Sequence, residues 1–300
     1  MGTVILASNH TIRLSAAWNA FWFWGVWAVC IIGIGIVLWA ALRGSEAQAA
    51  GAGRASGLAP LRSKRWARWT TQDLLIVAAL GVLLEVYDNI IGDQFIGPLT
   101  APIPGADLLQ VQDIVYMFLL MVGVALVRKP GCVTAMVFVN YLLMQLLFGS
   151  GHGALDWTDG LTQGIFCDLY IVARGGRVYG PKANVVTMFL DGLAIGALRG
   201  GPNAFLTDWT FDPYLNSIYY TLYQMWLDTW SNTVGNAVEA AITASLALRV
   251  ARSTLPSIGI GRQKAAPSGV DPFAEPDETA GQAAGEHPAT EIRPAGGEVG

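Results

Sequence analysis

The chain has 300 residues, of which 53% are hydrophobic and only 13% are charged, and its formal net charge is -4. Soluble globular domains carry about 25% charged residues, so this composition argues against a soluble domain. The presence of 11 tryptophans favours a membrane protein, because indole side chains are enriched at membrane–water interfaces.

The N-terminal part contains one apolar run and a basic linker. Residues 16–42 are apolar over enough length to cross a bilayer, which takes about 20 residues. The run is too long and too rich in tryptophan for a signal peptide and has no basic segment before it, so we expect an anchor helix in a segment comprising residues 1–43. Residues 44–72 are rich in Gly, Ala, Arg and Lys, and they predict a cytoplasmic linker that ends at the membrane surface.

Six further apolar segments follow within residues 73–252. They lie at 73–96, 111–127, 131–149, 160–174, 182–198 and 214–250. The last segment is too long for one simple crossing, so we expect its aromatic start to lie at the outer rim. Residues 253–300 are rich in Ala, Gly, Pro and Glu and predict a disordered cytoplasmic tail. The predicted fold class is an all-α polytopic membrane protein, with a six-helix bundle preceded by one extra transmembrane helix.

The distribution of basic residues predicts the orientation of these spans. If the linker is cytoplasmic, alternation of seven spans leaves only Arg13 and Arg199 outside, of 18 Lys and Arg in total. The outer loops at 97–110 and 150–159 contain no Lys or Arg. Basic residues concentrate on the cytoplasmic side of membrane proteins. We therefore expect a multi-pass plasma-membrane protein with its N-terminus outside and its C-terminus in the cytoplasm.

Three common nucleotide-binding and catalytic motifs do not occur in the sequence. There is no G-x-x-x-x-G-K-[ST] for binding ATP in a P-loop, no H-E-x-x-H and no G-x-S-x-G. The three histidines are too scattered to suggest a metal site, and the three cysteines lie inside apolar runs, as small core residues do. We therefore expect no cofactor and no metal, and a membrane-embedded enzyme is the least supported interpretation.

Carboxylates fall within or near the predicted spans, without Lys or Arg in the span interiors to neutralise them. They are Glu85, Asp88, Asp93, Asp168, Asp191, Asp228 and Glu239. Ionisable residues inside membranes are rare and usually functional, so acidic outer halves would suit a cationic or strongly hydrogen-bonding substrate. The alternative is that they are rim carboxylates in water or protonated helix caps. Glu85 and Asp88 lie about one turn apart and could share one helix face.

Four short motifs define the organisation of the unit. They are Leu-Ile-Val-Ala-Ala-Leu-Gly-Val at 75–82, Arg-Lys-Pro-Gly at 128–131, Gly-Ser-Gly-His-Gly at 149–153 and Gln-Gly at 163–164. Over about residues 73–250, the chain resembles the YkoE-like substrate-binding (S) components of energy-coupling-factor (ECF) vitamin importers. The family typically has Glu where Gln145 and Asp168 stand, and Trp where His152 stands.

The resemblance implies a membrane-embedded binder of a vitamin-like molecule, related to thiamine or its pyrimidine precursor. It also implies partners, namely a transmembrane coupling subunit and two cytoplasmic ATPase subunits that supply the energy. In such proteins the first helix of the unit offers small residues to the coupling subunit. Ala78, Ala79 and Gly81 are available here, and packing inside the unit explains them equally well.

In the predicted mechanism, the outer ends of the spans and the turn at 149–159 form a lidded pocket for a heteroaromatic or cationic ligand. Trp157 and Tyr116 would stack on it, although most aromatics in such a protein serve packing. The predicted substrate-binding residues are Asp168, Gln163, Gln145, Asn140, Trp157, His152, Glu85, Asp88 and Tyr116. The alternative function is an accessory or assembly membrane subunit without a ligand, which the anchor helix, the basic linker and the tail would suit.

Overall fold

The structure is a computed structural model, and it describes only part of the chain. The described residues are 11–51, 69–100, 102–103, 111–147, 149, 155, 157–175, 178–179 and 184–254. They form helices and no strand, apart from an isolated bridge between Thr11 and Thr221. The chain divides into the units Met1–Leu255 and Pro256–Gly300. The second unit, and with it nearly all of the predicted tail, lies outside the described residues.

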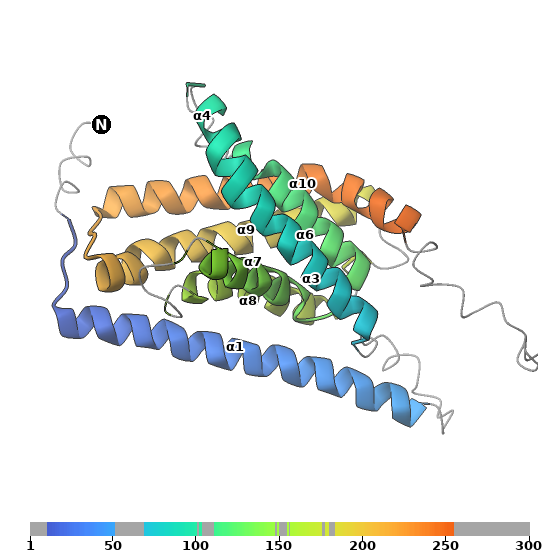
Figure 1. Cartoon of the computed structure of the whole chain (residues 1–300). Coiled ribbons are helices and arrows are strands. Elements are labelled where there is room, and N and C mark those ends of the chain that lie inside the picture. Colours follow the sequence, from blue (N-terminus) through green and yellow to red (C-terminus); the bar gives the residue numbers. More distant parts are fainter. Residues whose placement is uncertain are drawn as a thin grey trace, which may run out of the picture. The chain divides into compact units, whose positions relative to one another are not determined.

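The described part is a bundle of long helices (Figure 1). In chain order they are α1 (Ala16–Gly51), α3 (Thr71–Glu85), η2 (Val86–Ile96), α4 (Gly97–Thr100), η3 (Val111–Asp113), α6 (Ile114–Val127), α7 (Cys132–Leu147), α8 (Trp157–Arg174), α9 (Val185–Leu206), η5 (Thr207–Asn216) and α10 (Leu222–Thr254). The segments η2 and η5 are π-helical, and each continues the preceding α-helix without a break. As a result, α3, η2 and α4 form one continuous helical rod, and α9 and η5 form another.

Helix starts follow from local hydrogen bonding. Thr70 and Asp73 form a capping box at the start of α3, and Asn184 and Thr187 form one at the start of α9. Each box satisfies backbone N–H groups that the first turn of a helix leaves without a partner. The rod of α9 and η5 ends at Ser217, whose φ of 56° lies in the left-handed region.

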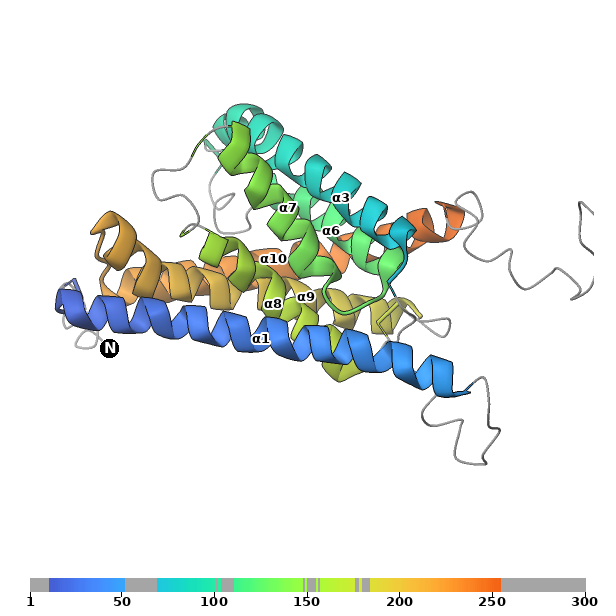
Figure 2. The ribbon, with the colours of Figure 1, turned by 60° about the horizontal axis from the view of Figure 1, so that its bottom comes forward.

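The helices pack in two groups, with α1 along one side. Figure 2 shows α3, α6 and α7 side by side, while α1 runs beside α8. The α9–α10 pair is the most closely packed, because Gly192, Gly196 and Gly200 of α9 face the backbone of α10. A Cβ atom at Gly196 would lie 2.1 Å from the carbonyl oxygen of Asn236, so only glycine permits this approach.

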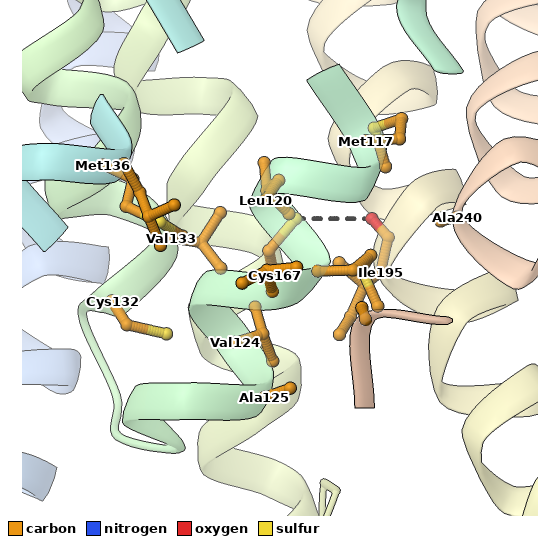
Figure 3. Close-up of a cluster of buried hydrophobic side chains, with 14 of the residues drawn as sticks. Met117, Leu120, Val124, Ala125, Cys132, Val133, Met136, Cys167, Ile195 and Ala240 are labelled. Carbon is orange, nitrogen blue, oxygen red and sulfur yellow. Dashed lines mark hydrogen bonds between the residues drawn. The ribbon is translucent and has the colours of Figure 1, made fainter. Parts of the chain in front are cut away.

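The core lies where α6 meets its neighbours. Figure 3 shows Leu120 and Val124 of α6 among residues of α7, α8 and α9. Cys132 and Cys167 are fully buried here, and Cys30 is buried against the bundle. The prediction that the cysteines are core residues without a disulfide is confirmed. The Cys167 thiol donates to the backbone oxygen of Ile195 at 3.3 Å, which gives its proton a partner.

Three helices in the described part are long and apolar enough to cross a membrane. They are Ala16–Leu42, Thr71–Thr100 and Leu222–Thr254, and the apolar helices α6 and α7 are shorter. These helices suggest a membrane-associated, helical protein. The predicted number of seven spans, one plus six, stays a prediction.

The structure differs from the predicted spans in the C-terminal half. The predicted span 182–198 becomes 185–206 and continues as a helix to 216, although Pro202 and Pro213 lie inside it. The predicted span 214–250 begins only at Leu222, since Ser217 ends the preceding rod. Arg199, which the span boundaries placed in an outer loop, is instead buried within α9 with 8% of its surface exposed.

Candidate functional site

Arg199 is the central cation of a polar cluster between α6, α9 and α10. Its guanidinium pairs with Asp113 at 3.4 Å and donates a hydrogen bond to the side-chain oxygen of Asn236. It also lies over the ring of Tyr116, 4.2 Å from the ring centroid, in cation–π geometry. Asn140 of α7 donates to the Tyr116 hydroxyl at 3.4 Å. The four side chains hold the charge of Arg199 in a fixed place inside the bundle.

Glu239 of α10 lies one turn after Asn236 and is only 4% exposed. Neither of its carboxylate oxygens has a hydrogen-bond partner among the described residues. The carboxylate interacts electrostatically with both Asp113 and Arg199, so it belongs to the same cluster. A charged carboxylate that is buried without hydrogen bonds is costly, typically by several kcal/mol, so this group either carries a proton or pairs with a partner that the described residues do not provide.

Glu85 at the end of α3 is a second buried carboxylate that lacks a hydrogen-bond partner on one of its oxygens. It is 1% exposed, its Oε1 accepts a hydrogen bond from Asn89 at 2.9 Å, and its Oε2 has no partner among the described residues. Asp88 on the next turn interacts electrostatically with Glu85 and with Arg199. We call Glu85, Asp88, Asp113, Arg199 and Glu239 the carboxylate cluster. Its four carboxylates outnumber its guanidinium, which suits a cation or a group with several N–H donors.

A second polar group lies around Asp159 at the start of α8. Its carboxylate accepts hydrogen bonds from Tyr141, from Asn203 at 2.6 Å and from Thr207 at 2.9 Å. Gln163 donates to the Tyr141 hydroxyl at 2.9 Å and to Asp159 at 3.3 Å. These bonds tie α7, α8 and the α9–η5 rod together. Tyr141 also interacts electrostatically with Tyr116 and with Arg199, so the two polar groups are neighbours.

Asp168 lies apart from the carboxylate cluster, at the first turn of α7. It is fully buried, and it accepts hydrogen bonds from the Thr134 backbone N–H at 2.7 Å, the Thr134 hydroxyl at 2.6 Å and the Val133 N–H at 3.4 Å. A carboxylate in this position stabilises the helix N-terminus through its free N–H groups and its dipole. The structure thus gives Asp168 a helix-capping role.

The Arg-Lys-Pro-Gly turn is fixed at the same end of the bundle. Lys129 forms a buried ion pair with Asp73 of α3, and the Trp69 indole donates to the Pro130 oxygen at 3.2 Å. Arg128 donates to the Ala125 oxygen at 2.8 Å, and both Arg128 (φ 54°) and Gly131 (φ 90°) have left-handed backbones. The turn therefore joins α3 to the connection between α6 and α7.

The structure thus separates the predicted substrate-binding residues. Tyr116, Asn140 and Asp88 come together around Arg199, and Glu85 joins them only through Asp88. Gln163 lies next to them in the Asp159 group. The Trp157 ring packs edge-on against Phe138, with centroids 5.2 Å apart, and Gln145 is half-buried on α7. His152 lies outside the described residues, and the side chain of Asp93 is also not described.

Sequence reasoning missed Arg199, Asp113, Asn236 and Asp159 as members of these groups. One signal was present, because Gly192, Gly196 and Gly200 recur at a spacing of four and predict close helix packing. A charged residue next to such a stripe is held against the partner helix, as Arg199 is against Asn236. Within the described residues, no group of three or more His, Cys, Asp or Glu is arranged to hold a metal ion.

The fold and the two polar groups define a class, a helical membrane-associated protein with a buried, carboxylate-rich cluster inside its bundle. Comparison of the chain with family models, with curated proteins and with solved structures finds no match.

Proposed function

We propose that the protein is a membrane-embedded binding subunit that captures a cationic, heteroaromatic small molecule at the carboxylate cluster. In this proposal, the subunit is the S component of an ECF-type importer for a molecule related to thiamine or its precursor. A coupling subunit and two ATPase subunits would supply the energy. The resemblance of the 128–131 and 163–164 motifs supports the transport assignment, and the cluster supports the positive charge of the ligand.

The observation that carries the proposal is the environment of Glu239. A carboxylate that is 4% exposed and has no hydrogen-bond donor among the described residues calls for a positively charged or donor-rich partner. Glu85, at the end of α3, has a second such oxygen. Arg199 is already engaged by Asp113, Asn236 and Tyr116, which leaves the two glutamates for the ligand.

The arrangement changes the roles proposed for individual residues. Tyr116 has Arg199 over its ring, so we propose that it positions Arg199, whereas the hydroxyl groups of Tyr87 and Tyr141 already donate to the Gln112 backbone oxygen and to Asp159. Gln163 would orient Tyr141 through its hydrogen bond. Asp168, whose oxygens are taken up by the start of α7, is not part of the proposed site.

The test is the replacement Glu239→Gln, which keeps the shape of the side chain and removes its charge. Thiamine serves as the probe, in titrations of the full chain purified in detergent. We expect affinity to fall about 10- to 100-fold, because a hydrogen bond to a charged group contributes about 1.5–3 kcal/mol. The matched control is Asp228→Asn, an exposed carboxylate on the same helix, which should leave the affinity unchanged.

The outcomes separate the two functions under consideration. Equal affinity of the Glu239→Gln variant and the unmodified chain would remove the carboxylate cluster from the site. Mass spectrometry of molecules that co-purify with the chain covers ligands other than thiamine. A chain that retains no small molecule and binds no thiamine would favour the accessory-subunit function, whereas co-purification with a pair of ATPases would favour import.

A further inference from the structure

An apolar hollow of about 310 Å³ lies between α1 and the α7–α8 pair, and we call it the α1 hollow. Its walls are Ile34, Val37 and Leu38 of α1 and Ala135, Phe138 and Leu161 opposite them. Protein interiors contain few voids larger than a water molecule. Apolar cavities of about 150 Å³ stay dry and take up apolar molecules. A larger hollow with these walls therefore suits an apolar occupant and not a water cluster.

The polar atoms nearest to the α1 hollow are already engaged. Thr134 also borders the hollow, and its hydroxyl donates to Asp168 at 2.6 Å. The hollow therefore offers an occupant contacts with methyl, methylene and ring atoms only. It follows α7 from Gly131 to Phe138, a rise of about 10 Å at 1.5 Å per residue. This length fits within one leaflet of the hydrocarbon core, which is about 15 Å deep, half of the usual 30 Å.

One end of the hollow adjoins the basic turn. Gly131 borders the hollow and comes directly after Arg128, Lys129 and Pro130. Lys129 is paired with Asp73, but Arg128 lies near a second cation, and burial together with the charge of Arg252 lowers the pKa of Arg128. Arg128 and Lys129 both belong to the turn whose last residue, Gly131, lines the hollow. The hollow is thus apolar along its length, and a turn with two basic residues adjoins one end.

We propose that the α1 hollow binds one acyl chain of an anionic membrane phospholipid, whose phosphate lies toward the basic turn at 128–131. A membrane lipid is the expected occupant, because α1 is long and apolar enough to cross a membrane and Leu38 in the wall of the hollow is 56% exposed. The acyl chain would fill the space that α1 leaves against α7 and thereby join the extra helix to the bundle. This lipid site is independent of the carboxylate cluster and of what the cluster binds.

The test fills the hollow from either wall in the full chain, reconstituted in vesicles. Ala135→Phe and Ile34→Phe each place a ring into the space, and Leu75→Phe on the exposed face of α3 is the matched control. The probe is phosphatidylglycerol with a photoreactive diazirine in the middle of one acyl chain, in vesicles of unlabelled phosphatidylglycerol and phosphatidylcholine. Labelled peptides are identified by mass spectrometry, and phosphatidylcholine with the same diazirine tests the headgroup.

We expect saturable labelling at residues 34–38 and 131–138 of the unmodified chain and of the Leu75→Phe control. Both hollow-filling variants should reduce it at least about fivefold, the factor that corresponds to about 1 kcal/mol of lost affinity. Two variants on opposite walls guard against a folding defect in one of them, and each must elute as a single species. Labelling that does not saturate, or that survives both variants, would overturn the site. Equal labelling by the two lipids, which both contain a phosphate, would overturn the preference for an anionic headgroup.

Discussion

At the scale of single residues, the buried charges of this protein divide into those with partners and those without. Asp73, Asp159 and Asp168 each accept several hydrogen bonds or form an ion pair. Glu239 and one oxygen of Glu85 have no such partner among the described residues. Since an unpartnered buried charge costs more than a hydrogen bond contributes, the first set stabilises the fold, and the second set is where the proposed ligand would gain most from pairing.

The helix-capping role of Asp168 gives a prediction about stability. Asp168→Asn would place an amide N–H₂ or a single neutral oxygen against the N–H groups of Thr134 and Val133. We expect a loss of about 1–3 kcal/mol, the usual consequence of unsatisfied buried groups. Thermal unfolding of the detergent-purified variant measures it, and Thr134→Val should lose less because the backbone N–H still finds the carboxylate.

The same variant separates the capping role from a role in binding. Thiamine affinity measured below the unfolding range should be unchanged in Asp168→Asn, since the carboxylate cluster does not include this residue. An affinity loss without a stability loss would return Asp168 to the ligand site, as the sequence alone predicts. Its capping contact could not be foreseen, because Thr134 lies 34 positions away in sequence and on another helix.

At the scale of helices, apolar runs predicted most elements but not the ends of the longest ones. The segments at 111–127 and 131–149 correspond to η3 with α6 and to α7, because turns with Pro, Gly and charged residues bound them. The predicted span at 182–198 corresponds to most of α9, but its continuation to Asn216 was not predicted. Proline, here Pro202 and Pro213, removes a backbone N–H and usually ends a helix. Here π-helical turns re-pair the backbone beyond Leu206, which no local pattern indicates.

The close α9–α10 packing gives a prediction at this scale. Gly196→Ala would bring a Cβ atom to 2.1 Å from the backbone oxygen of Asn236, which cannot move away as a side chain can. We expect the helices to separate and the stability to fall by about 1–3 kcal/mol, as overpacked cores do. Thermal unfolding in detergent is the measurement. Gly35→Ala on α1 is the control, because nothing lies within 4 Å of its Cβ position, and an unfolding shift equal in both variants would contradict the packing argument.

At the scale of the whole molecule, the basic turn at 128–131 lies at the same end of the bundle as several helix ends. In Figure 1, the C-terminal ends of α1 and α10 lie toward the same end of the bundle as the start of α3. The basic turn at 128–131 contacts the start of α3, so it belongs to that end. The exposed outer surfaces of α1 and α10 carry large apolar side chains, as lipid-facing helices do. The composition therefore predicted a helical, membrane-associated protein even though the predicted helix boundaries were partly wrong.

The predicted orientation can be tested with introduced cysteines. Asn216→Cys lies at the end of η5, and Ser253→Cys lies in the last turn of α10, both at exposed positions. The three native cysteines are buried, so a membrane-impermeant maleimide should not reach them. Because basic residues favour the cytoplasmic side, we expect labelling of position 216 in intact cells and of position 253 only after permeabilisation. The reverse pattern would place the carboxylate cluster's end of the bundle inside the cell and exclude uptake from the outer face.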